Sequence, residues 1–501
     1  MEVAGRKVTA YSVALFGVFL VGAFLRLYHL GTQSIWWDEA FSVWISKQSL
    51  SQIVQTTATD VHPPLYYFIL HYWIALFGTS EVAVRSLSVL FGVLAVPMIY
   101  AVGRQLFNEE AGLLSALILA LSSFNIWYSQ ETRMYTLMVL LALLSMYFFT
   151  RFLQKTTVAV SVGYFISTTL LLYTHVYGAF VVIAQNVYLL TLLVFWRERE
   201  FRLKYWIMLQ ALLVVFFAPW IGVLISQILR RARWVAIAPP TLHTVLDVFV
   251  RYAGMDVLLV LFIGLSLFSL FEHQKFRGAM DWKVPLKALQ SYAWEVRIAN
   301  VEPVYFLAVW LFTINIIPFV ISWLTQPIYQ DLYTIAASVA LYLLVAKGIS
   351  NINHRYSKLA VIAIVVALLA APLQTGYTTI IKAQGREATS FIDANAKSGD
   401  VVLITPGGHS LLFDYYNNRT DLAVKPIKYW ETTQSSNRSD DKVKEIQSYV
   451  NGRERVWLFN VTRERSNAAD DFTFKILNVS YANTEVMSYH GYVVYLFEKR
   501  A

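Results

Sequence analysis

The chain has 501 residues, of which 57% are hydrophobic and 15% charged, and its mean hydropathy is +0.50. This balance excludes an ordinary soluble protein and predicts a helical protein with many membrane spans. The net charge of +9 does not indicate a nucleic-acid partner, because the basic residues of a membrane protein gather in cytoplasmic loops. No cysteine is present, which excludes disulfides, a thiolate nucleophile and a cysteine-bound metal.

The first predicted element is an apolar helix that follows Arg6 and Lys7 and runs to about Leu30. This run is long enough to cross a bilayer and too long for a signal peptide, so we expect a retained helix. Further apolar segments of similar length bring the expected number of spans to about 11. We place the spans at 8–30, 83–103, 110–128, 133–153, 158–175, 177–196, 205–226, 245–271, 303–324, 331–347 and 357–375.

Charge predicts the orientation of these spans. Lysines and arginines are frequent in one set of connections, such as Arg151–Lys155 and Arg197–Lys204, and sparse in the alternate set. The basic set should be cytoplasmic. We therefore expect a multi-pass plasma-membrane protein with a cytoplasmic N-terminus. The first loop (about residues 31–82), the 125–131 turn and the chain after about 376 should be extracytoplasmic.

The tail differs from the rest of the chain. Helix-like and strand-like stretches alternate there, which predicts a small extracytoplasmic α/β domain. The helix-like stretches are 387–396 and 440–450, and the strand-like ones are 401–405, 455–461 and 492–497. We accordingly divide the chain into a transmembrane domain, 1–380, and a soluble domain, 381–501.

Three polar stretches lie beside predicted spans on the predicted outer side. They read SIWWDEAFS (34–42), TDVHPPLYY (59–67) and YSQETRMY (128–135). Each has a plain structural interpretation: a solvated acid pair, a satisfied turn histidine, or residues that cap a helix. Arg85 could reach out to the membrane edge, and His175 could be a satisfied turn residue. Acids, a histidine and an arginine at one interfacial level nevertheless indicate a functional site.

This set of residues suits one type of chemistry. A carboxylate near the membrane surface can accept a proton from an acceptor hydroxyl. A cationic side chain can hold a lipid phosphate and stabilise it as it leaves, so that no general acid is required. The set therefore fits transfer of a group from a lipid phosphate to an alcohol.

The same stretches also resemble a known family. RLYHLGTQSIWWDEAFS (26–42), DVHPPLYY (60–67) and YSQETRMY (128–135) resemble GT-C glycosyltransferases, closest to the protein O-mannosyltransferase and lipid A aminoarabinose transferase group. The resemblance covers about the first 200 residues, and the tail 387–416 also looks like the extracytoplasmic domain of many prokaryotic members. It implies a GT-C fold and a polyprenyl-phosphate sugar donor. It also implies generally inverting transfer to a hydroxyl of a protein, glycolipid or polysaccharide.

The resemblance assigns roles to residues that match the motifs. Asp38 matches the proposed catalytic base, and Glu39 is its usual companion. His62, Arg133 and Arg85 are candidates for binding the donor phosphate or sugar. The candidates for positioning the acceptor or sugar are Asp60, Glu131, His175 and Tyr135.

One stretch departs from the family pattern. Many relatives carry an Arg-Tyr pair that opens a late helix, whereas QPIYQDLY (326–333) contains no arginine. Arg230, Arg231 or Arg233 could supply this basic contact instead. No cofactor is required by the chemistry. Asp38, Glu39, Asp60, Glu131 and His62 are suited to a divalent metal, although no spacing demands one.

The expected partners are a polyprenyl-phosphate sugar, the lipid bilayer and an unidentified hydroxyl acceptor, with no nucleic acid. A second interpretation is a transporter or flippase for a polyprenyl lipid, since intramembrane charges serve those proteins too. Against it, the sequence has no internal inverted repeat, and its polar residues gather on one side of the membrane. A third is a non-catalytic scaffold, which the acid-bearing loop disfavours.

Overall fold

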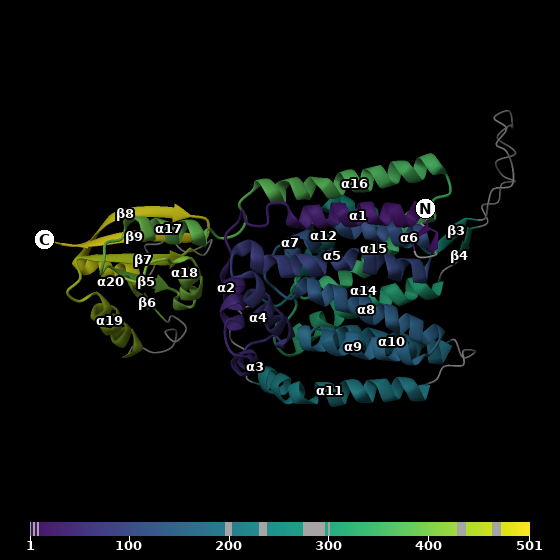
Figure 1. Ribbon diagram of the computed structural model, residues 1–501, viewed down its shortest axis with the longest axis horizontal. Helices are drawn as coiled ribbons and strands as arrows, with labels where there is room; N and C mark the ends of the chain where they lie inside the picture. The colour runs from purple at the N-terminus through teal and green to yellow at the C-terminus, as the bar shows by residue number, and fades with distance from the viewer. Residues whose placement is uncertain are drawn as a thin grey trace. The chain divides into compact units, whose positions relative to one another are not determined.

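The computed structural model describes residues 2–3, 6–7, 10–195, 203–229, 238–273, 296–298, 301–427, 437–462 and 472–500 (Figure 1). The chain forms two compact units, each built from several stretches. The membrane unit comprises residues 1–28, 49–75 and 85–375, and the mixed-sheet unit comprises 29–48, 76–84 and 376–501. The two ends of the first loop thus belong to the same unit as the C-terminal residues.

Seven continuous helices among the described residues are long and apolar enough to cross a membrane. They are α1 (Ala10–Leu27), α5 (Glu81–Leu106), α8 (Tyr135–Gln154), α10 (Gly178–Phe195), α11 (Leu203–Leu229), α14 (Val301–Leu324) and α16 (Arg355–Thr378). Figure 1 shows these helices running side by side, as the alternation of apolar runs and short basic connections predicts. The predicted multi-pass helical membrane protein is confirmed.

Two apolar helix pairs are bent at positions where the sequence predicted single spans. The pair α6 (Glu109–Leu121) and α7 (Ser123–Ser129) bends by 60°, and the pair α12 (Leu242–Ala253) and α13 (Asp256–Phe268) bends by 85°. The second bend lies at Gly254, whose φ of +100° is a conformation that side-chain-bearing residues rarely adopt. Hydropathy does not detect such a break, because the apolar run continues through it.

Two apolar helices are shorter than a full span. They are α9 (Val158–Thr174) and α15 (Ile335–Ser350), of 17 and 16 residues, at positions where the sequence predicted spans. Every residue of α15 from Ile335 to Ile349 is buried, with α6, α13 and α14 packed around it. A helix that is apolar all round and enclosed by other helices forms the centre of a core.

The first loop contains three short helices. They are α2 (Trp37–Ser46), α3 (Leu50–Thr59) and α4 (Leu65–Phe77). The Ser49 hydroxyl caps α3 by accepting from the Gln52 N–H at 3.4 Å. Pro63 and Pro64 separate α3 from α4, because proline disfavours helix in the residue before it. Two small antiparallel pairs, β1 (Glu2–Val3) with β2 (Arg6–Lys7) and β3 (Phe271–His273) with β4 (Val296–Ile298), lie elsewhere in the chain.

The mixed-sheet unit contains one five-stranded sheet, in the order β6 (Ala423–Pro426), β5 (Val401–Thr405), β7 (Arg455–Val461), β9 (Tyr492–Lys499) and β8 (Tyr481–Tyr489). β5 pairs in parallel with β6 and β7, whereas β9 pairs antiparallel with β7 and β8. Its helices are α17 (Gly385–Asn395), α18 (Ser410–Tyr416), α19 (Asn437–Val450) and α20 (Phe472–Ser480). The predicted α/β domain is confirmed.

Both faces of this sheet are covered. Val401 and Leu403 of β5 pack in one core with Ile446 of α19. Val402 and Ile404 face the opposite core, which also takes in Ile35 of the first loop. Alternate side chains of a strand point to opposite faces, so a strand covered on both sides reads as a continuous apolar run. The first loop is therefore anchored in this unit by the burial of Ile35, whose side chain is fully inaccessible.

Candidate active site

The His62-Pro63-Pro64 stretch is held in place at the end that follows α3. α3 ends at Thr59, and the Gln227 amide of α11 donates to the carbonyls of Thr57, at 3.1 Å, and Asp60. Because these carbonyls lie at the helix end, they need partners from outside the helix. The turn between this fixed end and Pro63 places His62 in the protein interior, where it is 2% exposed.

His62 lies against a second histidine. Its ring centroid is 4.8 Å from that of His175, which directly follows the end of α9. The Tyr177 N–H donates to His175 Nδ1 at 3.1 Å, so the neutral form of His175 carries its proton on Nε2. Burial lowers the pKa of His62 well below its usual value, and His175 and Arg133 lower it further. Burial also lowers the pKa of His175 to about 3, with Arg133 adding to the effect. Both imidazoles are therefore neutral near pH 7.

Tyrosine rings surround this histidine pair. Tyr333 lies 5.7 Å from His62 and 5.0 Å from His175, measured between ring centroids. Tyr135, the first residue of α8, lies 6.3 Å from His175. Aromatic rings with hydroxyl groups present flat apolar faces together with polar edges, which suits a ligand that combines both characters.

Arg133 brings a cation to the same cluster. Its guanidinium carbon lies 5.9 Å from the ring centroid of Tyr135, and its Nη1 is 3.5 Å from the Tyr67 hydroxyl. The Arg133 carbonyl accepts from the Ser88 hydroxyl of α5 at 3.0 Å, so the backbone is fixed as well. The residue is 4% exposed. The guanidinium therefore places a positive charge beside the tyrosine and histidine rings, and a guanidinium is well suited to bind a phosphate.

The turn that carries Glu131 and Arg133 is positioned from α1. Arg26 is fully buried and donates to the carbonyls of Leu119 and Ala120 at 3.0 and 3.2 Å, at the end of α6. Its Nε also donates to the Ser129 hydroxyl, at the end of α7, at 3.2 Å. One guanidinium thus satisfies carbonyls at the α6–α7 break and fixes the point from which the turn departs.

Asp38 and Glu39 lie together in the first turn of α2, in the mixed-sheet unit. Glu39 is fully buried, accepts from the Trp36 N–H at 3.4 Å and pairs with Lys382 at 3.2 Å. Asp38 is half-buried, and its backbone carbonyl accepts from the Ser42 hydroxyl. Of the two acids, Glu39 has an evident structural role as a capping residue with a buried counter-ion, whereas Asp38 remains accessible.

The structure thus places the predicted residues in two groups. His62, Arg133, Tyr135 and His175 are joined by direct contacts in the membrane unit. The remaining candidates of that unit are Asp60, half-buried at the end of α3, Arg85, 1% exposed in α5, and Glu131, 2% exposed. Among the described residues, no group of three or more histidines or acids is arranged to hold a metal ion.

Some residues of this region were not predicted. Tyr333 and Tyr177 complete the ring cluster, and Arg251 of α12 pairs with Asp331 at 3.0 Å. Asp331 and Tyr333 lie in the QPIYQDLY stretch, which the sequence singled out only for its missing arginine, and Arg251 falls inside a segment that reads as one continuous span. The suggested alternatives Arg230, Arg231 and Arg233 lie outside the residues that the structure describes.

Comparisons with known proteins bear on both the fold and this cluster. Residues 61–223 match the family model described as dolichyl-phosphate-mannose-protein mannosyltransferase, a range that contains His62, Arg133 and His175. No curated protein is significantly similar to the chain in sequence.

Solved structures resemble the whole chain. ArnT from Cupriavidus metallidurans bound to undecaprenyl phosphate has a TM-score of 0.61 at 13% identity, and the match covers 98% of each chain. The archaeal oligosaccharyltransferase AglB from Archaeoglobus fulgidus, in complex with an inhibitory peptide and a dolichol-phosphate, has a TM-score of 0.53 at 12% identity. That match covers 89% of this chain and 69% of AglB. The predicted GT-C fold with a C-terminal domain is confirmed.

Proposed function

We propose that this chain is a membrane glycosyltransferase of the GT-C type, because its residues 61–223 match the dolichyl-phosphate-mannose-protein mannosyltransferase family model and its fold is similar to that of ArnT. In the proposed reaction, a sugar passes from a polyprenyl-phosphate donor to a hydroxyl acceptor at the outer face of the membrane. The acceptor belongs to a protein, a glycolipid or a polysaccharide.

One observation carries this proposal: the buried guanidinium of Arg133 lies in one cluster with the neutral imidazoles of His62 and His175 and with several tyrosine side chains. A lipid-linked sugar phosphate presents an anion, a polar ring and an apolar chain. The cation suits the phosphate, and the hydroxyl and imidazole edges suit the sugar hydroxyls. The structures of ArnT and AglB similar to this chain were obtained with undecaprenyl phosphate and a dolichol-phosphate, which supports a donor of this class.

The chemical step displaces a phosphate at the anomeric carbon. The acceptor oxygen forms a bond to that carbon while the bond between the carbon and the phosphate oxygen breaks. The electron pair of the broken bond remains on the phosphate, which leaves as polyprenyl phosphate. The acceptor proton passes to the Asp38 carboxylate. Attack opposite the leaving group inverts the anomeric centre.

The other side chains act by position and charge. Arg133 neutralises charge that develops on the leaving phosphate, which stabilises the transition state more than the bound donor. His175, neutral and with a proton on Nε2, can donate a hydrogen bond without adding charge. The ion pair of Glu39 with Lys382 holds the first turn of α2, on which Asp38 stands.

A donor assay tests the proposal. Purified protein in detergent is offered a panel of polyprenyl-phosphate sugars with candidate acceptors, and release of polyprenyl phosphate is followed. We expect release from at least one donor, and a loss of about 10²-fold or more in Arg133→Gln. Arg104→Gln is the matched control, because this exposed arginine lies at the opposite end of α5 from Ser88, which binds Arg133. Tight lipid binding without release from any donor and acceptor would favour a transporter instead.

A further inference from the structure

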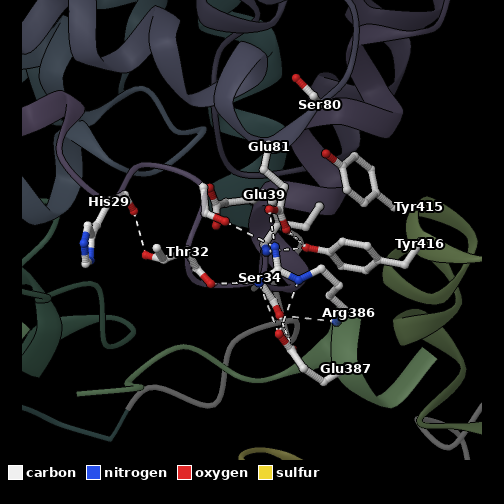
Figure 2. A network of polar contacts seen from close by, with 12 residues as sticks. His29, Thr32, Ser34, Glu39, Ser80, Glu81, Arg386, Glu387, Tyr415 and Tyr416 are labelled. Carbon is white, nitrogen blue, oxygen red and sulfur yellow. Dashed lines mark hydrogen bonds and ion pairs between the residues drawn. The ribbon is translucent and has the colours of Figure 1, made fainter. Parts of the chain in front are cut away.

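Arg386 is the second residue of α17, and all three of its guanidinium nitrogens donate hydrogen bonds (Figure 2). Its Nη1 donates to Glu81 at 2.6 Å and to the Gly31 carbonyl at 3.2 Å. Its Nη2 donates to the Thr32 carbonyl at 2.7 Å, and its Nε donates to Glu387 at 3.3 Å. One side chain therefore bonds to three different stretches of the mixed-sheet unit.

These partners stand at opposite ends of the first loop. Gly31 and Thr32 precede α2, whereas Glu81 begins α5. Arg386 thus closes the base of a loop of about fifty residues. The planar fork of a guanidinium can bind a carboxylate and two carbonyls at once, whereas the single ammonium of a lysine cannot reproduce that geometry.

Further bonds connect this base to the start of α2. The Tyr416 hydroxyl donates to Glu81 and accepts from the Ile35 N–H at 2.7 Å. The Ser34 hydroxyl donates to Glu387 at 2.6 Å (Figure 2). Burial alone would raise the pKa of Glu387, but the bonds from Ser34 and Arg386 hold it below its usual value. The network reaches Ile35, three residues before Asp38.

We infer that Arg386 is a positioning residue for the reaction: it fixes the base of the first loop and thereby the place of Asp38. The inference rests on the proposed function, in which Asp38 is the base. The C-terminal stretch then holds the first loop from a distance along the chain, since it supplies Arg386, Glu387 and Tyr416.

The exposure of the Arg386 ion pairs indicates that this residue positions the loop more than it stabilises the fold. The Arg386 side chain is 34% exposed, that of Glu387 33% and that of Glu81 13%. The ion pairs of a guanidinium this accessible contribute modestly to stability, because solvent screens them and ordering them costs entropy. Loss of the network should therefore affect the geometry of the loop more than the survival of the fold. A displacement of about 1 Å at a reacting group can lower a rate about 10²-fold.

The test compares Arg386→Met and Arg386→Lys with Arg419→Met. Arg419 is the matched control: it belongs to the same unit and pairs with Asp421 at 2.6 Å. Its other partners among the described residues are the carbonyls of Asp393 and Ala396, away from the first loop. Donor release, the melting temperature Tm and amide hydrogen exchange are measured on the full-length protein.

We expect Arg386→Met to lower kcat at least tenfold and to leave the KM for the donor within about twofold, because Arg133 and His62 are unchanged. Arg386→Lys should recover part of the rate, and Arg419→Met should keep it within about twofold. The Ile35 amide should exchange faster in Arg386→Met only. Equal rates in Arg386→Met and Arg419→Met, or unchanged exchange at Ile35, would overturn the inference. If the wild-type protein releases lipid phosphate from no donor, the proposed function fails, and the exchange comparison still decides whether Arg386 holds the loop.

Discussion

The buried Arg26 provides a strong test of how the α6–α7 break is held. In Arg26→Met the apolar stem remains, but the carbonyls of Leu119 and Ala120 lose the donor that they share. A buried carbonyl left without a partner costs about 1–3 kcal/mol, so the two together cost about 2–6 kcal/mol. Removal of a buried charge offsets part of this loss. We expect net destabilisation of the order of 2 kcal/mol or more.

The assay is thermal unfolding in one detergent, with Arg104→Met as the control. A loss of this size should lower Tm by roughly 2 °C or more, because the unfolding entropy grows with chain length and this chain has 501 residues. Arg104 is exposed, and its guanidinium carbon lies 5.9 Å from the ring centroid of Tyr100, so its substitution should change stability by less than about 0.5 kcal/mol. Equal Tm values for the two variants would refute the argument that Arg26 supports the break.

Three other predictions concern single side chains. His175 has a folded pKa of about 3 against an ordinary 6.5, so the unfolded chain binds one more proton between these values. Stability should therefore fall as the pH drops below 6.5, by up to about 1.4 kcal/mol per pH unit. In His175→Asn, whose side-chain oxygen can still accept from the Tyr177 N–H, the slope of Tm against pH should be smaller, and an unchanged slope would contradict the assignment. Gly254→Ala should lower Tm because a β-carbon is strained at a φ of +100°, and a Tm equal to or above that of the wild type would contradict this. Lys382→Met leaves the buried Glu39 without its counter-ion and should cost about 3–5 kcal/mol; addition of Glu39→Gln should restore part of the Tm, and absence of rescue would show that the pair is not coupled.

The sequence predicts the helices of the membrane unit well because a bilayer demands long apolar segments. It does not predict their bends. The 85° bend at Gly254 depends on one backbone conformation, and the α6–α7 break depends on an arginine about 95 residues earlier in the chain. In the sheet, β5 and β7 begin and end where predicted, since covered strands read as unbroken apolar runs. β8 was missed because most of its residues are exposed and its pattern is polar.

In the candidate site too, the sequence predicts residues that belong to local motifs and misses those whose partners are distant in the chain. His62, Arg133 and Tyr135 belong to local motifs that single out ionisable residues beside apolar spans. Lys382 and Arg386 have no such signal. Their partners Glu39 and Glu81 are more than 300 residues away, and pairing over that separation leaves no local pattern. The structural role of Glu39 was hidden for the same reason, because its counter-ion comes from the far end of the chain.

The central claim is that Asp38 takes the acceptor proton as the sugar leaves its lipid phosphate. The most direct measurement is the rate of polyprenyl-phosphate release by Asp38→Asn, on the donor that the wild-type protein uses, with Asp247→Asn as the exposed-acid control. The account predicts a loss of about 10²-fold or more in Asp38→Asn, with unchanged Tm and donor binding, and a normal rate in the control. A wild-type rate in Asp38→Asn would remove Asp38 from the mechanism and contradict the account.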